Sequence, residues 1–270
     1  MNGMIRNGIK NFLHKKGLYY PLKYSRLFTF YQLLFKPAAT KQQRLEISFY
    51  KSFLPACKLI FDIGANDGHK TAAFLTLAEK VICCEPDKQS LKQLLARFRN
   101  QRRRVTIENK ALSDKEGFAE LHIHHPGSAF NTLSNKWMKL LEEEGEKRWN
   151  EQIKFTVTET VPTTTLDNLI RKYGLPDYIK IDAEGFEEHV LKGLSQPVPY
   201  LSFETLIPDY SKELQNCLAA VESLDKAAKY NIALREQLIL PGYVDRHELE
   251  DWLKTNNNAP SFEVIVKMSA

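Results

Sequence analysis

KLIFDIGANDGHKTAAFLTLAEKVICCEP, residues 58–86, is the stretch that decides the fold. It contains a short apolar run, a turn with two glycines, a segment with helical apolar periodicity and a second apolar run, at 59–61, 64–68, 74–78 and 81–84. A strand, a tight turn, a helix and a second strand in this order are typical of an α/β protein with a parallel sheet. Glu85 follows the second run, 21 residues after Gly64, which is the spacing of a nucleotide-binding unit.

The turn between the first strand and the helix is predicted to hold a ligand. Gly64 and Gly68 allow positive φ angles and leave no Cβ between the backbone and that ligand. The first strand would deliver the turn to the carboxyl edge of the sheet, where open α/β folds bind ligands. A carboxylate just after the second strand lies where a ribose presents its hydroxyls, so Glu85 is the expected ribose contact.

The residues inside the turn distinguish between nucleotides. A dinucleotide site has a close glycine pair that brings a helix N-terminus onto the pyrophosphate, and here Ala65 and Asn66 replace that pair. Asp62 and Asp67 would also repel phosphate. A nucleoside with a positive centre and no phosphate fits better, which indicates S-adenosylmethionine. An NAD-dependent oxidoreductase of Rossmann type, built on the same plan, is the alternative.

Four segments together indicate a family: FDIGANDGHKT, CCEPD, TTLDNL and YIKIDAEGFEEHVLKGL, at 61–71, 83–87, 164–169 and 178–194. In this order and spacing they resemble the motifs of the FkbM family of S-adenosylmethionine-dependent methyltransferases, over residues 59–204. The resemblance implies an α/β fold with the Rossmann-like, seven-stranded sheet of class I methyltransferases. It also implies O-methylation of a small-molecule or glycan acceptor, commonly a sugar or a secondary metabolite. A non-catalytic methyltransferase-like binding module is the alternative.

The resemblance also assigns residues to the cofactor. Carried onto this sequence, it places five residues at S-adenosylmethionine: Asp62, Gly64, Asn66, Gly68 and Glu85. It further places the segment after the third strand beside the adenine, and that segment contains Ala111, Leu112, Ser113 and Asp114. For the serine and the aspartate, an ordinary turn is the other interpretation.

Acidic residues after the predicted fourth strand, 178–181, are the candidates for the reaction itself. Asp182 and Glu184 would lie next to the first strand and face the transferred methyl group. In one arrangement either of them is the base, with His189 a lesser candidate one helical turn further on. In a second arrangement, Asp182 and Glu204 bind Mg²⁺, which would lower the pKa of the acceptor hydroxyl. Lys180, inside the strand, is expected to pair with an acid.

Residues 117–161 interrupt the alternation of strands and helices. Two segments alternate like strands, 118–124 and 155–161, and a polar helix is predicted at 136–149. Long insertions in compact domains usually serve as lids or binding loops, so this one is predicted to capture the substrate. Ser128, Asn131 and Thr132 are polar loop residues that would hydrogen-bond a substrate hydroxyl, with a plain turn as the alternative.

Three histidines in the insertion raise the question of a metal. His122 and His124 share one face of the predicted strand, and His125 follows them. No cysteine or carboxylate stands nearby in the sequence at ligand spacing, so surface or substrate-facing histidines are the favoured interpretation.

Residues 1–55 form a predicted helical arm, and residues 56–270 form the methyltransferase domain. Apolar stripes with helical spacing predict three helices: Ile5, Ile9, Phe12 and Leu13; Leu27, Phe30, Tyr31, Leu34 and Phe35; and Leu45, Phe49 and Phe53. Nine Lys or Arg residues precede the first acid, Glu46, so the remaining chain has 29 bases and 33 acids. The arm would meet a membrane or a phosphate-bearing substrate, or pack on the domain or on a second subunit in a homodimer.

The rest of the chain supplies the remaining strands and several exclusions. Further strands are predicted at 105–107, 197–204, 230–235 and 262–266, which brings the sheet to seven. Arginines around 97–104 are interpreted as a solvated helix end and not as a nucleic-acid site. The four cysteines lack metal spacing and are expected to be reduced core thiols. With no signal peptide or membrane span recognised, a cytoplasmic location is expected.

Overall fold

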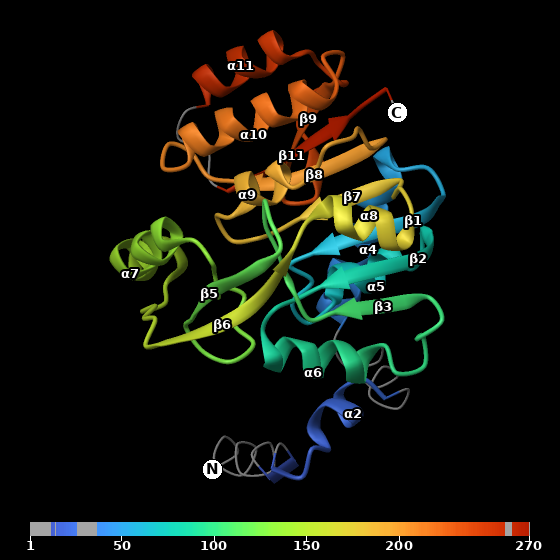
Figure 1. Cartoon of the computed structure of the whole chain (residues 1–270), viewed down its shortest axis with the longest axis vertical. Helices are drawn as coiled ribbons and strands as arrows, with labels where there is room; N and C mark the ends of the chain where they lie inside the picture. Colours follow the sequence, from blue (N-terminus) through green and yellow to red (C-terminus); the bar gives the residue numbers. More distant parts are fainter. Residues whose placement is uncertain (1–11, 14, 26–36, 257–260, 270) are drawn as a thin grey trace.

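The computed structural model describes residues 12–13, 15–25, 37–256 and 261–269. Its centre is an eight-stranded sheet with the strand order β10-β9-β11-β8-β7-β1-β2-β3 (Figure 1). The strands are β1 (Cys57–Ile63), β2 (Ala78–Cys84), β3 (Val105–Glu108), β7 (Tyr178–Ile181), β8 (Tyr200–Thr205), β9 (Lys229–Leu234), β10 (Gln237–Leu238) and β11 (Phe262–Lys267). The predicted seven-stranded class I sheet is confirmed, and β10 is one short strand more.

The parallel strands at the middle of the sheet end at the same level. In β1, Ile63 pairs with Cys84 of β2 on one side and with Ile181 of β7 on the other. The residues that follow these three strands therefore meet at one edge. The strand β11 runs antiparallel to both β8 and β9, which makes the sheet mixed.

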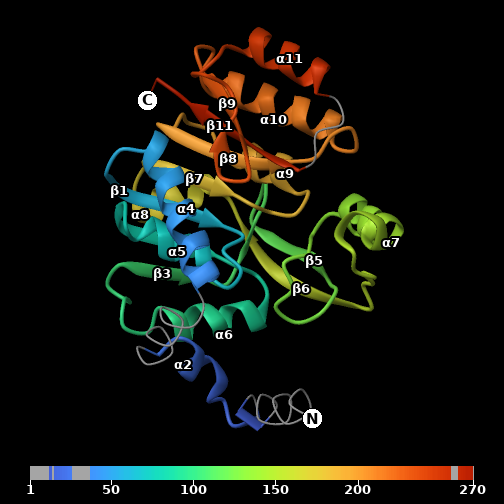
Figure 2. The same ribbon diagram turned by 180° about the vertical axis from the view of Figure 1, so that it is seen from behind.

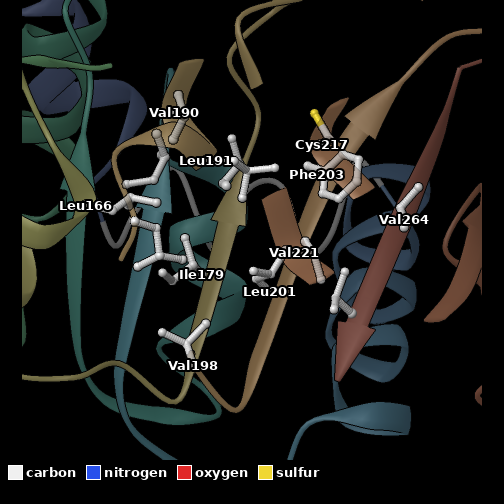
Figure 3. Packing of buried hydrophobic residues seen from close by; sticks show 14 of the residues in the cluster. Leu166, Ile179, Val190, Leu191, Val198, Leu201, Phe203, Cys217, Val221 and Val264 are labelled. Carbon is white, nitrogen blue, oxygen red and sulfur yellow. The ribbon is translucent and has the colours of Figure 1, made fainter. Parts of the chain in front are cut away.

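Helices cover both faces of the sheet. One face is covered by α4 (Pro37–Phe53), α5 (His69–Phe74) and α6 (Lys88–Arg97), and the other by α8 (Leu166–Tyr173), α9 (Glu187–Lys192), α10 (Ser211–Leu224) and α11 (Arg246–Thr255) (Figures 1 and 2). Alternate strand residues face the two layers. Figure 3 shows Ile179, Leu201 and Val264 packed with residues of the second helical layer. Cys83 and Cys84 belong to opposite layers, and all four cysteines are buried and free, as predicted.

The predicted insertion forms a small sheet of its own with the order β4-β6-β5. The insertion contributes β5 (Gly117–Ile123), α7 (Asn135–Trp149) and most of β6 (Val157–Thr164), and the short strand β4 (Ala111–Leu112) precedes it. This sheet and α7 lie beyond the carboxyl ends of the central strands (Figure 1). The insertion is therefore placed over the edge at which ligands are expected.

The predicted arm is described only in part. The segments 1–11 and 26–36, which carry most of the first two apolar stripes, lie outside the described residues. In the third stripe, Phe49 and Phe53 are buried, whereas Leu45 is 48% exposed. Tyr50 packs on Phe74 with a ring-centroid distance of 4.6 Å, so α4 is part of the core of the domain. The short helix α2 (Tyr19–Lys23) lies against α6.

The structure corrects one element boundary in the deciding stretch. The helix predicted across 74–78 ends at Phe74, and Ala78 already begins β2. Arg104 explains this early end, since its Nη2 donates to the carbonyl oxygens of Leu75 and Ala78 at 2.6 Å each. A side chain 26 residues away therefore satisfies carbonyl groups that a longer helix would have used.

Other arginines of the predicted solvated run behave differently from one another. Arg97 donates to the backbone oxygen of Asp67 at 2.8 Å, and Arg99, Arg102 and Arg103 are exposed. Within the described part of the chain, no helix combines the length and the apolarity that crossing a membrane requires.

Candidate active site

The ends of β1, β2 and β7 open into a cavity of about 840 Å³, partly open to solvent, which we call the first cavity. Its walls are residues 62–66 at the end of β1 and after it, 84–86 at the end of β2 and after it, and 182–184 after β7. Residues 110–112 close one side. The insertion covers the cavity with Ser128, Ala129, Asn131, Thr132 and Leu133. The three residues predicted to contact a substrate, Ser128, Asn131 and Thr132, therefore lie at this cavity.

Glu85 is the buried acid on the β2 side of the first cavity. Its Oε2 accepts a hydrogen bond from the backbone N–H of Asn66, and its Oε1 accepts one from that of Asp87, both at 2.8 Å. Burial raises the pKa of Glu85 to about 7. Each carboxylate oxygen has a second lone pair, so the side chain can still accept hydrogen bonds from ligand hydroxyls. The turn and the start of the next loop thus hold the Glu85 carboxylate in one orientation at the first cavity.

The two glycines of the turn serve the protein more directly than a ligand. At Gly64, φ is +79°, and a Cβ would lie 1.7 Å from the backbone oxygen of Asp182. At Gly68, φ is also +79°, and a Cβ would lie 2.6 Å from a ring carbon of Phe98. Gly64 lines the first cavity, whereas Gly68 does not. The predicted positive φ is found at both glycines, but the prediction that Gly68 makes room for a ligand is corrected, since a Cβ there would meet Phe98 at the end of α6.

The two acids of the turn point in different directions. Asp62 is 1% exposed, lines the first cavity and accepts a hydrogen bond from Thr71 Oγ1 at 2.5 Å. Asp67 does not line the cavity and accepts from Arg97 Nη1 at 3.2 Å. Burial opposes the ionisation of Asp67, but His69 and Arg97 outweigh it and hold its pKa well below the ordinary value. Asp67 therefore joins the turn to α6.

Only the first half of the segment predicted to lie beside the adenine reaches the first cavity. Ala111 and Leu112 line the first cavity, together with Lys110 and Leu121. Ser113 and Asp114 are not among its lining residues. The Ser113 hydroxyl donates to Asp114 at 2.9 Å, and its backbone N–H donates to Thr164. These two residues belong to the turn between β4 and β5, which is the turn that was the other interpretation.

Asp182 lies in a cluster of buried charges. Its Oδ2 is 2.8 Å from Lys70 Nζ and 3.6 Å from Lys180 Nζ. Lys180 is 1% exposed and also lies 3.6 Å from Glu263, which confirms the predicted pairing with an acid. Burial opposes ionisation of Asp182, but Lys180 and Lys70 outweigh it and hold its pKa well below the ordinary value. Asp182 is therefore a stable carboxylate between two ammonium groups.

A second cavity of about 290 Å³ adjoins the first and shares Asp182 and Glu184 with it. Its other lining residues are Trp137, Gly185, Glu187, Glu204, Thr205, Leu206, Tyr210 and Ser261. The rings of Trp137 and Tyr210 pack edge to face with centroids 5.5 Å apart. At Gly185, a Cβ would lie 2.6 Å from the Tyr210 hydroxyl oxygen. The second cavity therefore combines acids with an aromatic wall.

Glu184 lies at the junction of the two cavities in an unusual backbone conformation. Its φ is +51°, a conformation that is uncommon outside glycine and is concentrated at functional sites. The Thr132 hydroxyl donates to the Glu184 carbonyl oxygen at 2.6 Å, so the insertion holds this loop in place. Burial, with the nearby carboxylates of Asp182 and Glu204, raises the pKa of Glu184 well above its ordinary value.

The structure does not bring His189 to the site. His189 is exposed on α9, lines neither cavity and stacks on Phe186 with ring centroids 4.2 Å apart. Residues that sequence analysis did not identify take its place, namely Lys70, Trp137, Glu187, Tyr210 and Ser261. The motif segments quoted above contain Lys70 and Glu187, and the other three come from α7, α10 and the chain before β11.

The acids proposed for Mg²⁺ do not suit a bound divalent ion. Glu204 lines the second cavity with Asp182 and is hydrogen-bonded by the Ser261 hydroxyl. However, Lys70 and Lys180 already supply the positive charge beside Asp182 that a metal ion would supply. For S-adenosylmethionine the residues do fit, because the first cavity joins the free acceptor positions of Glu85 to the acids after β7.

Comparisons with known proteins bear on this site. The chain matches no curated protein. Among solved structures it is similar to a methyltransferase FkbM from Methylobacillus flagellatus KT, with 16% identity and a TM-score of 0.45, over 68% of this chain and 43% of that one. It is also similar to a precorrin-6y C5,15-methyltransferase from Geobacter metallireducens GS-15, with 11% identity and a TM-score of 0.43, over 84% and 86% of the chains. An rRNA methylase from Streptococcus thermophilus has 13% identity and a TM-score of 0.40, over 83% and 94%.

A family assignment comes from a separate match. The chain spans less than half of the Methylobacillus protein. The sequence profile described as the methyltransferase FkbM domain matches residues 62–204, which is more than half of the 270 residues. This range contains both acids after β7, the turn after β1 and Glu85. The protein therefore belongs to the FkbM family of S-adenosylmethionine-dependent methyltransferases.

Proposed function

We propose that this protein transfers the methyl group of S-adenosylmethionine to a hydroxyl oxygen of a sugar, a glycan or a secondary metabolite. The observation that carries the proposal is the junction of two cavities at Asp182 and Glu184. One cavity has the features of a nucleoside site, and the other, which adjoins it, has acids and an aromatic wall. A methyl group donated from the first cavity and accepted in the second would pass these two acids.

The chain's own residues would orient the cofactor before the reaction. Glu85 would accept hydrogen bonds from the ribose hydroxyls, while Asn66 keeps its carboxylate in place. The apolar segment at Ala111 and Leu112 would cover the adenine. When bound, S-adenosylmethionine supplies an electrophilic methyl group on a sulfonium. Methyl transfer is an in-line displacement, so much of the rate enhancement would come from holding the two reactants in line.

Sequence analysis gave two acids as candidates for the base, Asp182 and Glu184. Of these, Glu184 is the better candidate. Asp182 is paired with two lysines, and its low pKa makes it a weak base. Glu184 has a raised pKa, so its ionised form binds a proton more strongly. Positive charge in the first cavity would favour that ionised form. We therefore assign proton removal from the acceptor hydroxyl to Glu184, and assign the orientation of the acceptor to Asp182.

The lining of the second cavity favours an uncharged hydroxylated ring at the reacting end of the acceptor. Asp182, Glu187 and Glu204 offer oxygen atoms to hydroxyl donors, and Trp137 and Tyr210 offer an aromatic wall. A phosphate in this cavity would face several carboxyl groups. A phosphate-bearing acceptor would therefore keep its phosphate outside the second cavity. The basic N-terminal segment would then contact that phosphate or a membrane, and a role in a homodimer stays the other prediction for it.

The proposal is tested by turnover with a panel of hydroxylated acceptors. The purified chain is incubated with S-adenosylmethionine, and both released S-adenosylhomocysteine and the methylated product are measured. We expect an O-methyl product. Replacing the carboxyl in Glu184→Gln should lower turnover by about 100-fold, whereas His189→Gln should keep it within about twofold.

Three results would contradict the proposal. A product methylated on nitrogen or carbon would contradict O-methylation. Equal turnover of Glu184→Gln and the unchanged protein would remove Glu184 as the base. Cofactor binding without turnover of any acceptor class would instead favour a non-catalytic binding module.

A further inference from the structure

A group of three side chains in the insertion is used by neither cavity. It consists of His124, His125 and Glu151, and the ligand atoms of the three side chains all lie within 4.8 Å of one another. The two histidines follow β5, and the glutamate follows α7, so the group joins the two ends of the insertion. None of the three residues lines the first or the second cavity.

The hydrogen bonds of His124 orient its ring toward Glu151. Its Nδ1 lies 3.0 Å from the carbonyl oxygen of Lys154, and its Nε2 lies 3.3 Å from Oε1 of Glu151. The backbone N–H of Lys154 donates to Nδ1 at 3.3 Å in the tautomer with the proton on Nε2, whereas in the tautomer with the proton on Nδ1 the ring donates to the Lys154 carbonyl oxygen. In this tautomer Nε2 carries a lone pair, and it faces a carboxylate oxygen that also accepts.

In the tautomer with the proton on Nδ1, these two acceptors repel each other unless a cation lies beside them, so a bound ion would select this tautomer over the one in which Nε2–H donates to Glu151. A histidine that donates one ring nitrogen to a carbonyl and leaves the other free is the usual arrangement of a metal ligand. His125 supplies a third ligand, since its ring centroid lies 4.8 Å from that of His124. Phe130 and Phe155 back the His124 ring, with centroids 6.2 Å and 6.1 Å away. Apolar backing of this kind limits the ways in which the ring can turn.

We propose that His124, His125 and Glu151 bind one divalent transition-metal ion of the zinc class. Two imidazoles and one carboxylate are a donor set for zinc and leave a fourth position for water. Magnesium prefers oxygen ligands, so this donor set selects against it. Sequence spacing failed to indicate the site because the carboxylate comes 26 residues after His125 and meets it only through the fold of the insertion.

Asn131 connects this metal site to the first cavity. Its Oδ1 accepts from the backbone N–H of His124 at 2.9 Å, and its Nδ2 donates to the His125 carbonyl at 3.1 Å. The same Nδ2 lies 3.2 Å from an oxygen of Asp87, which caps α6. Asn131 also lines the first cavity. A bound ion would therefore hold the loop 125–131 against the cavity that it covers.

The test is a titration of the full chain with Zn²⁺, after removal of any affinity tag and bound metal. Calorimetry gives affinity and stoichiometry, and the absorption of bound Co²⁺ reports a four-coordinate site. We expect one ion per chain and a rise in melting temperature on binding. His124→Ala and Glu151→Gln should each weaken Zn²⁺ binding by at least about tenfold, because each removes one ligand.

His122→Ala is the matched control. His122 lies on β5, two residues before His124, and its ring nitrogens contact Asn135 and Thr158 instead of the metal site. This variant should keep Zn²⁺ affinity within about twofold. Glu151 is half-exposed, so Glu151→Gln should fold even where His124→Ala does not. The proposal is overturned when the unchanged chain binds no stoichiometric Zn²⁺, or when Glu151→Gln and His124→Ala bind it as tightly as the unchanged chain.

Discussion

The two cavities are built in different ways although they meet at one edge of one sheet. The first cavity depends largely on backbone geometry: a turn with a left-handed glycine, two backbone N–H groups on Glu85, and an apolar segment. The second depends on side chains, with acids and an aromatic pair from several parts of the chain, and it shares Asp182 and Glu184 with the first. The first contains Glu85, an acid held by backbone donors alone, and the charged network around Asp182 lies where the two cavities meet.

The difference suggests how each site tolerates change. A backbone-built cavity fails when the backbone is prevented from adopting its conformation, and it tolerates many side chains. A network of buried charges fails when one partner is removed, because the others stay buried without compensation. The cofactor cavity is therefore expected to be generic, and the acceptor cavity to be specific to its substrate.

Removing the central carboxylate of the charged network should have the largest effect. Asp182→Ala would leave the ammonium groups of Lys70 and Lys180 buried without their shared partner. We expect a loss of about 3–5 kcal/mol in the free energy of unfolding and about a thousandfold loss of turnover. Denaturant unfolding and product release measure the two effects. If Asp182→Ala still binds S-adenosylhomocysteine but has lost turnover, the two cavities differ in how far they depend on Asp182.

Asp182→Asn is the control for this variant. It keeps the shape of the side chain and removes the charge, so it should also lose stability. If Asp182→Ala is as stable as the unchanged protein, the network does not depend on this carboxylate. The proposed difference between a backbone-built cavity and a charged network would then be wrong.

The substitution Gly64→Ala, which adds a Cβ in the turn after β1, should have the next largest effect. Gly64→Ala would place a Cβ 1.7 Å from the Asp182 carbonyl oxygen, at a φ of +79°. Relief requires the β1 and β7 loops to separate, so both cavities should change. We expect a loss of more than about 2 kcal/mol in the free energy of unfolding and about 100-fold weaker cofactor binding. Calorimetry with S-adenosylhomocysteine measures the second value, and Gly174→Ala is a control at a positive φ with open space around it.

Cofactor affinity should depend on pH through Glu85. The carboxylate accepts ribose hydroxyl groups better than the protonated acid does, and its pKa is about 7 in the folded protein. Binding therefore favours the ionised form, so affinity should rise with pH up to about 7 and level off above it. Below pH 7 it should fall by up to about tenfold per pH unit. Titrations of S-adenosylhomocysteine between pH 5.5 and about 8.5 measure this slope.

Glu85→Gln provides the control for the pH profile. The variant should bind the cofactor product about 30-fold more weakly at pH 8, since it loses charge-assisted hydrogen bonds. Its remaining affinity should not change with pH in this range. A pH slope that persists in Glu85→Gln would assign the titration to another group.

The smallest expected effect concerns the hydrogen bond that joins the insertion to the acid loop. Thr132 donates to the Glu184 carbonyl oxygen and accepts from the Ser134 N–H, at 2.6 Å and 2.8 Å. Thr132→Val keeps the shape and removes both bonds. We expect about a fivefold lower turnover, with cofactor affinity within about twofold. A larger effect on cofactor affinity than on turnover would mean that Thr132 acts on the cofactor in the first cavity, which it lines, and not through the acid loop.

Sequence alone determined the sheet and most of the first cavity. Strand and helix periodicity is local, and so is the distance from Gly64 to Glu85, so seven strands and the ligand turn could be placed from residue order. The same reasoning placed Asp182 and Glu184 at the carboxyl end of β7, because parallel strands end at one edge.

Only the tertiary structure decided which side chains complete the acceptor cavity and the metal site. Trp137, Tyr210 and Ser261 reach the second cavity from elements that no local pattern links to β7. Likewise, Glu151 meets His124 only because the insertion folds back on itself. Contacts between residues far apart in the chain depend on how elements pack, and packing leaves no periodic signal in the sequence. For the same reason His189, which stands one helical turn from the acids, proved to lie outside both cavities.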